Sequence, residues 1–185
     1  FEFTGNWDSD HPVNTLKNFK GYLQSDGYSG YLKVARRDDV TAIGCWSHTR
    51  RKFFEAAKIG VKEAEYFVTL TDILYRIEHR MAALKNRKYS EDYIQALRLN
   101  RATRVMNRFF DKAKASFLLP KSPLGKALTY ALNHEAALRY YPEQLRFFPD
   151  NNVSENALRP LCLGKKNYMF FGNEGGGKTA AVLYS

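Results

Sequence analysis

Cysteine is scarce in this chain of 185 residues, which has only Cys45 and Cys162, far apart in the sequence. No C-x-x-C pair and no cluster of cysteine and histidine at zinc-ligand spacing is present, which argues against a disulfide framework and a structural zinc site. Long apolar runs are also lacking, since no stretch approaches the roughly 18 to 20 residues that span a bilayer. We therefore expect a soluble protein of a reducing cytoplasm, with no membrane partner.

Acidic residues are fewer than basic residues in this chain. The chain has 29 lysines and arginines against 19 acidic residues, a net charge of +10, which favours a polyanionic partner such as DNA. Hydrophobic residues make up 44% and aromatic residues 15%, more than a disordered basic tail would carry. The composition and length predict a globular protein with one core, or one domain that carries an insertion.

The first third of the chain has the pattern of a strand–helix–strand unit. Val40 to Trp46 has the β-branched content of a buried strand, and Asp26-Gly27 ends a shorter strand-like run. A strand, a helix and a second strand in succession are typical of a parallel pair. The predicted elements are a strand at 1–4, a helix at His11–Phe19, a strand at Tyr22–Ser25, a helix at Tyr28–Arg37 and a strand at Val40–Trp46.

Helical periodicity dominates the middle of the chain. From Val61 to Leu84 the apolar residues recur every three or four positions, and a second long helix is predicted from about Glu91 to Phe117. The other predicted elements are a helix at His48–Ile59 capped by Ser47, a helix at Leu124–Tyr141 and a strand at Asn167–Phe171. We expect residues 61–120 to be a helical insertion between two parts of one core, at 1–60 and 121–185.

Two acidic residues occupy unlike settings. Asp26 follows the predicted strand at Tyr22–Ser25, and Glu155 lies at the start of a predicted helix. Each has a purely structural alternative. Asp-Gly is a common turn signal. Glu155 fits a capping box with Asn152 or an i, i+4 ion pair with Arg159. If the fold brings strand end and helix start together, the two carboxylates could instead share a divalent metal ion.

Four segments in order resemble the transposases of the insertion-sequence sixty-six family, and together they cover nearly the whole chain. These segments are 23–31, 44–53, 150–160 and 164–172. The resemblance implies an α/β fold of the ribonuclease H-like type, a mixed sheet flanked by helices, here with its N-terminal strands missing and an α-helical insertion. It also implies a DDE transposase that performs metal-dependent DNA cleavage and strand transfer.

By the same resemblance, Asp26 matches the second aspartate of the catalytic triad and Glu155 the glutamate. The first aspartate is expected upstream of Phe1, since Asp8 and Asp10 match no family motif. We therefore expect an excerpt of a longer enzyme, inactive by itself and associated with the nucleoid in the intact protein. Carboxylate ligands suit Mg²⁺ or Mn²⁺ as the cofactor. The implied partners are transposon ends and target DNA.

Several basic residues are candidates for DNA contact. Arg98, Arg101, Arg104 and Arg108, with Lys112, recur at three- or four-residue steps, which indicates either a phosphate-binding helix face or an ordinary solvated one. A second set lies within the resembling segments and is expected on the active-site side, together with His48. This set comprises Arg50, Arg51, Lys52, Lys165 and Lys166.

Two other functions remain open. A non-catalytic DNA-binding module would explain the charge and the helices but not the settings of Asp26 and Glu155. Residues 172–179 fit the phosphate-loop pattern G-x-x-x-x-G-K-[ST], which would make Lys178 part of a nucleotide site. Metal-dependent nicking and Lys178-dependent ATP binding would separate these alternatives. An unpaired sheet edge further predicts self-association.

Overall fold

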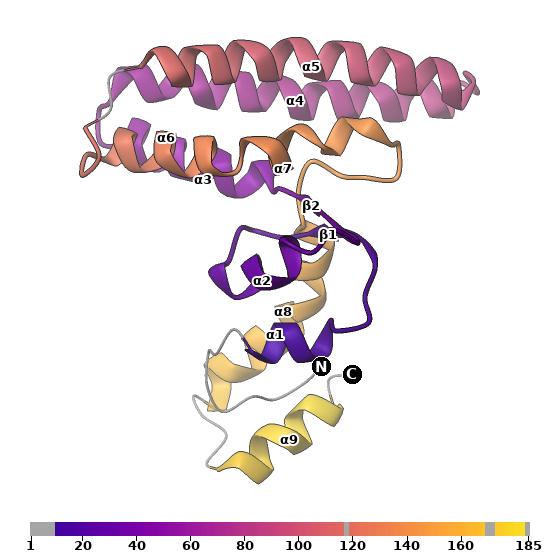
Figure 1. The fold of residues 1–185 in the computed structure, drawn as a ribbon, viewed down its shortest axis with the longest axis vertical. Coiled ribbons are helices and arrows are strands. Elements are labelled where there is room, and N and C mark those ends of the chain that lie inside the picture. Colours follow the sequence, from indigo (N-terminus) through magenta and orange to yellow (C-terminus); the bar gives the residue numbers. More distant parts are fainter. Residues whose placement is uncertain (1–9, 117–118, 169–172, 184–185) are drawn as a thin grey trace.

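The computed structural model describes residues 10–116, 119–168 and 173–183 of the chain. Within these ranges helices predominate, and the long α4–α5 hairpin lies at one end of the molecule with α3 and α6 beside it (Figure 1). The helices are α1 (Asp10–Thr15), α2 (Leu32–Ala35), α3 (Trp46–Lys58), α4 (Lys62–Asn86), α5 (Glu91–Ala115), α6 (Pro123–Asn133), α7 (Glu135–Arg139), α8 (Asn152–Tyr168) and α9 (Glu174–Leu183). Short 3₁₀ turns are η1 (Ser29–Tyr31) and η2 (Tyr141–Glu143), and the strands are β1 (Gly21–Gln24) and β2 (Val40–Ile43).

The core of the helical body is rich in aromatic rings. Phe53 of α3 stacks on Phe67 of α4 with ring centroids 4.5 Å apart, and Phe109 of α5 contacts both rings edge-on. Trp46, at the start of α3, contacts Phe109 at 5.2 Å, and its Nε1 donates to the carbonyl of Leu138 at 2.9 Å. These side chains are fully buried, so the apolar stripe of each amphipathic helix faces a common centre.

The two long helices α4 and α5 confirm the helical periodicity read from the sequence, with boundaries shifted by about two residues. Ser90 ends the connecting turn, and its Oγ accepts from the backbone N–H of Tyr93 at 3.3 Å as an N-cap. The hairpin shares one hydrophobic core with α3, α6 and α7. The boundaries at residues 60 and 120, which would make this stretch an insertion, stay a prediction.

A parallel pair of strands is also confirmed. Gly21 of β1 pairs with Val40 of β2 and Gln24 pairs with Ile43, while η1 and α2 form the crossover between the strands. Ser25 extends the ladder by donating its N–H to the carbonyl of Ile43 at 3.1 Å. Because the strands run the same way, Asp26 and the start of α3 both leave the sheet at its carboxyl-terminal edge.

The predicted ribonuclease H-like mixed sheet is wrong. In the described part of the chain the sheet has two strands, β1 and β2, and helices make up most of the structure. The strand predicted at Asn167–Phe171 is not formed at Asn167 and Tyr168, which end α8, and the rest of it lies outside the described residues. Leucine and lysine, strong helix formers, are frequent after Pro160 and favour a helix that continues to Tyr168. The strand predicted at 1–4 also lies outside the described residues.

Local boundaries differ elsewhere for identifiable reasons. Ser47 lies inside α3 rather than capping it, because the helix begins at Trp46 directly after β2. The helix predicted at Leu124–Tyr141 is interrupted at His134, which ends α6 and precedes α7. Pro142 lies in η2, where it closes this helical stretch as expected.

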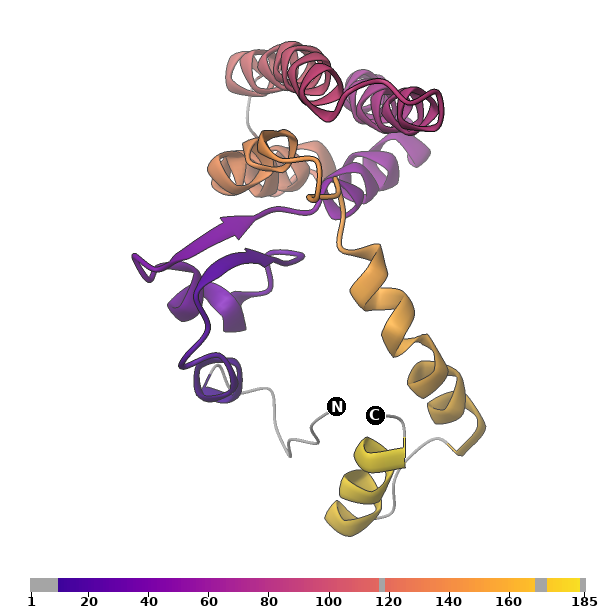
Figure 2. The same ribbon diagram turned by 90° about the vertical axis from the view of Figure 1, so that its right-hand side faces the viewer.

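Helix α8 leaves the helical body and extends away from it, as Figure 2 shows from the side. Every residue from 152 to 160 is exposed, so this first part of α8 presents its side chains to solvent. Among the described helices none is long and apolar enough to cross a membrane.

Candidate active site

Asp26 lies in the turn directly after β1. Its Oδ1 accepts from the backbone N–H of Tyr28 at 3.0 Å, and Ser25 Oγ accepts from the N–H of Gly27 at 3.4 Å. Gly27 has a φ of +81°, a conformation that L side chains rarely adopt, which explains the Asp-Gly pair. Asp26 and Gly27 therefore form the turn that the Asp-Gly pair indicates. No described residue bonds to the second oxygen, Oδ2, which leaves it available to a ligand.

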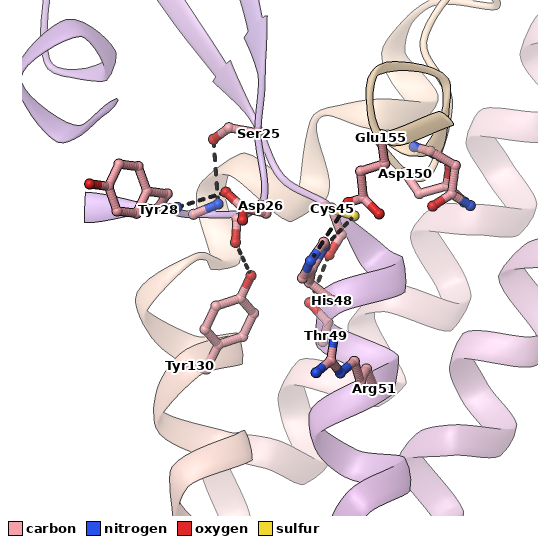
Figure 3. Close-up of polar contacts among 12 residues, drawn as sticks. Ser25, Asp26, Tyr28, Cys45, His48, Thr49, Arg51, Tyr130, Asp150 and Glu155 are labelled. Atoms are coloured by element: carbon pink, nitrogen blue, oxygen red, sulfur yellow. Dashed lines mark hydrogen bonds and ion pairs between the residues drawn. The ribbon is translucent and has the colours of Figure 1, made fainter. Parts of the chain in front are cut away.

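The beginning of α3 brings a histidine and a thiol to the same edge. His48 Nδ1 lies 3.2 Å from Cys45 Sγ, and the hydroxyl of Thr49 donates to the carbonyl of Cys45 at 3.2 Å (Figure 3). Cys45 is buried, and burial raises the pKa of its thiol above the usual range. A buried neutral thiol is a packing group rather than a nucleophile, so the accessible group here is His48.

Glu155 is held at this edge by the segment that precedes α8. Trp46 donates its N–H to the carbonyl of Pro149 at 2.7 Å, which joins the start of α3 to this segment. Asp150 Oδ2 accepts from the hydroxyl of Tyr75 at 2.9 Å, and Asp150 Oδ1 accepts from the N–H of Asn152 at 3.1 Å. Asp150 thus anchors the start of α8 to α4.

Within the first turn of α8, Glu155 points toward α3. Its Oε1 lies 3.7 Å from His48 Nε2, and the side chain is 47% exposed. In the described structure it forms no ion pair with Arg159, and the backbone N–H of Asn152 donates to the Asp150 carboxylate rather than to Glu155. The contacts therefore favour neither structural alternative for Glu155 and leave its carboxylate beside the half-buried His48.

Asp26 and Glu155 lie in one region of the molecule, on either side of Cys45 and His48 in the view of Figure 3. The carboxylates of Asp26 and Glu155 do not contact each other. Among the described residues no three His, Cys, Asp or Glu side chains gather into a metal-binding group. The donor chemistry fits Mg²⁺ or Mn²⁺, because both residues offer free carboxylate oxygens, but the pair by itself is an incomplete ligand set.

The basic residues of α3 follow His48 along the helix, and each contacts another side chain. Arg50 Nε donates to Asp72 at 2.6 Å, and Arg51 Nε donates to Glu55 at 3.0 Å. Lys52 places its Nζ 4.6 Å from the centre of the Tyr130 ring. Arg51 and Lys52 are exposed, so an anionic ligand could reach them at small cost.

Arg98 does not belong to an exposed phosphate-binding face. It is 1% exposed and donates to Glu78, to the carbonyls of Tyr141 and Gln144, and by Nη2 to the carbonyl of Phe147. The prediction of DNA contact by Arg98 is wrong for a geometric reason. A step of three residues turns the side chain by about 300°, so the two steps from Arg98 to Arg104 move it by about 120° around the helix.

The other basic residues of this series on α5 differ in exposure. Arg104 and Arg108 are exposed, Arg101 is half-buried, and Lys112 pairs with Glu63 at 3.1 Å. Lys165 and Lys166 belong to the last turns of α8. Contact of any of these residues with DNA stays a prediction.

The phosphate-loop pattern at 172–179 falls largely in a helix. Gly175, Gly176 and Gly177 lie in α9, and Asn173 Oδ1 accepts from the N–H of Gly176 at 2.8 Å as a helix cap. A phosphate loop instead leaves its glycine N–H groups free to surround the anion. The helical glycines therefore give nucleotide binding no support, and Lys178 is an exposed helix residue.

Two residues at this site carry no sequence signal. Tyr130 holds the turn of Asp26, and Tyr75 holds Asp150 before the start of α8, yet neither tyrosine falls in one of the resembling segments. The hydroxyl of Tyr130 donates to the backbone carbonyl of Asp26 across 104 residues of sequence. Such contacts depend on how distant helices pack, and a helical tyrosine looks the same in sequence whether or not it makes one.

Comparison with known proteins defines the class. The model of a family described as Transposase IS66 family matches residues 1–179. The chain therefore belongs to this family of transposases. Two uncharacterized proteins of Sinorhizobium fredii (strain NBRC 101917 / NGR234), y4qI and y4jD, are 29% and 33% identical to it over 194 and 181 residues. No solved structure matches at a significant level.

The chain spans about a third of the length of these relatives. The matches cover 99% and 92% of this chain but 35% and 34% of y4qI and y4jD. The activity of a whole protein of this kind is consequently a matter for proposal.

Proposed function

We propose that this protein is part of a DDE-type transposase that performs metal-dependent DNA cleavage and strand transfer, with Asp26 and Glu155 as two of the metal ligands. The observation that carries the proposal is the transposase-family match over residues 1–179. The contact of Glu155 with His48, and the position of Asp26 in the same region (Figure 3), support the assignment of these two residues within it.

The described residues would contribute position and charge. The turn after β1 presents Asp26 Oδ2, and the Asp150 anchor presents the Glu155 carboxylate on the first turn of α8. Bound Mg²⁺ or Mn²⁺ would supply charge stabilisation for the phosphoryl oxygens in both cleavage and joining. A further carboxylate from elsewhere in the protein is needed to complete the ligand set, since the described part holds no three-ligand cluster.

Exposed basic side chains would hold the DNA near these carboxylates. Arg51 and Lys52 project from α3 one turn beyond His48, and Arg104 and Arg108 extend along α5. Arginine and lysine contacts to phosphates release counterions, so the binding should weaken steeply with salt. The net charge of +10 favours such binding.

Substitution of the two carboxylates tests the assignment. Asp26→Asn and Glu155→Gln preserve shape but remove charge, and each should reduce Mg²⁺-dependent cleavage of element-end DNA by more than the roughly 10- to 100-fold that loss of an outer-shell partner causes. Glu65→Gln, an exposed carboxylate of α4, is the matched control and should cleave normally. Normal cleavage by either site variant of the intact protein would refute the proposed ligands.

A non-catalytic DNA-binding module is the second candidate. The observation in its favour is that the described residues contain no group of three potential ligands. In that case the intact protein would bind DNA with the same salt dependence but would not nick it with Mg²⁺ or Mn²⁺ present.

A further inference from the structure

The turn that carries Asp26 is held from outside by α6. The Tyr130 hydroxyl donates to the backbone carbonyl of Asp26 at 2.6 Å, which is a short hydrogen bond. It is the contact through which α6 reaches the backbone of this residue, whereas the Asp26 side chain is bonded locally, to Tyr28. The carboxylate therefore takes its direction from a backbone that Tyr130 fixes (Figure 3).

The side chain of Tyr130 joins three parts of the structure. On the ring, Lys52 Nζ lies 4.6 Å from the centroid, so the side chain links α3, α6 and the Asp26 turn.

His134 follows Tyr130 by four residues and packs beside the chain turn that carries Asp26. Its Nδ1 lies 2.7 Å from the carbonyl oxygen of Tyr130, and its ring lies 4.4 Å from the Tyr130 ring. A Cβ added to Gly27 would lie 2.5 Å from His134 Nε2. The histidine ring thus occupies the space beside the turn, and the glycine is required there both by its φ and by this contact.

We propose that Tyr130, backed by His134, is a positioning residue that sets the orientation of the Asp26 carboxylate for metal binding. The inference rests on the proposed function, because it assigns Asp26 to the metal. It adds Tyr130 of α6 and His134, which directly follows α6. Neither belongs to the four resembling segments, and both act through the backbone of the turn rather than by touching the metal. Outer partners of this kind orient ligands in many metal sites.

Tyr130→Phe is the sharpest test, since it removes one oxygen and keeps the ring, its contact with the His134 ring and its contact with Lys52. Binding of Mn²⁺ to the intact protein, followed by electron paramagnetic resonance of the free ion, should weaken by about tenfold or more. The unfolding temperature should fall by no more than about 4 °C. DNA binding measured in EDTA should not change.

Tyr31→Phe is the matched control. Tyr31 lies in η1, also near the Asp26 turn, and its hydroxyl bonds to no described residue, so its variant should bind Mn²⁺ as the unmodified protein does. Asp26→Asn separates this inference from the function it rests on. If Asp26→Asn weakens Mn²⁺ binding while Tyr130→Phe matches Tyr31→Phe, the positioning role is wrong and the metal assignment stands. If Asp26→Asn also binds normally, both are wrong.

Discussion

At the scale of single residues, His48 links the start of α3 to the start of α8. His48 is central, since its two ring nitrogens face Cys45 Sγ at 3.2 Å and Glu155 Oε1 at 3.7 Å. A histidine between a buried thiol and an exposed carboxylate can orient that carboxylate, and it can also reach a phosphate brought to the same edge.

Replacement of His48 by Ala should therefore reduce strand transfer more than DNA binding. The loss would remove a group beside Glu155 while the exposed cations proposed to hold DNA remain. Gel-shift and joining assays on the intact protein measure the two effects separately, and His79→Ala, an exposed histidine of α4, serves as the control. Equal loss of binding and joining in the His48 variant would contradict this role.

At the scale of elements, the α4–α5 hairpin supports the segment that leads to Glu155. Arg98 of α5 donates to carbonyls of Tyr141, Gln144 and Phe147, and Gln95 donates to the carbonyls of Pro142 and Glu143. Tyr75 of α4 donates its hydroxyl to the side-chain carboxylate of Asp150. The hairpin thereby fixes the path of the chain between η2 and α8.

Arg98→Ala should accordingly destabilise the fold by about 3 kcal/mol, because it leaves buried carbonyls and the Glu78 carboxylate without their partner. Chemical denaturation measures the loss. Arg104→Ala, two helical steps along and exposed, should change stability by no more than about 0.5 kcal/mol but lower DNA affinity and reduce the salt slope by about one. Equal stability of the two variants would mean that Arg98 does not hold this segment.

The sequence predicts elements better than it predicts contacts. Periodicity located α4 and α5, and the strand–helix–strand pattern gave the parallel pair β1 and β2, because both signals are local. The burial of Arg98 and the contact of Tyr130 with Asp26 depend on packing across many residues, which spacing along one helix does not encode. The strand expected at Asn167 was wrong because the helix tendency of α8 prevails up to Tyr168.

At the scale of the whole molecule, the helical core and the short sheet differ in how fully they are covered. Buried residues from Ile43 to Phe147 form one hydrophobic core. The sheet, in contrast, consists of β1 and β2 alone within the described residues, so each strand has an unpaired edge. Unpaired edges favour association through added strands.

We expect this chain to self-associate as its concentration rises. Sedimentation velocity over a wide concentration range should show a growing fraction of dimer or larger species. A Pro substitution at Tyr22, which removes a backbone N–H from β1, should reduce that fraction if the edge is the contact. A clean monomer at high concentration would count against edge association.

The metal site that we propose Asp26 and Glu155 share can be tested most directly by iron-mediated cleavage of the protein backbone. Fe²⁺ bound in place of Mg²⁺ generates hydroxyl radicals with ascorbate and peroxide, and these cut the chain near the metal. For the intact protein we predict cuts beside both Asp26 and Glu155, both suppressed by excess Mg²⁺. Cuts beside one of the two residues and not the other, or at neither, would show that the two carboxylates do not hold the same ion.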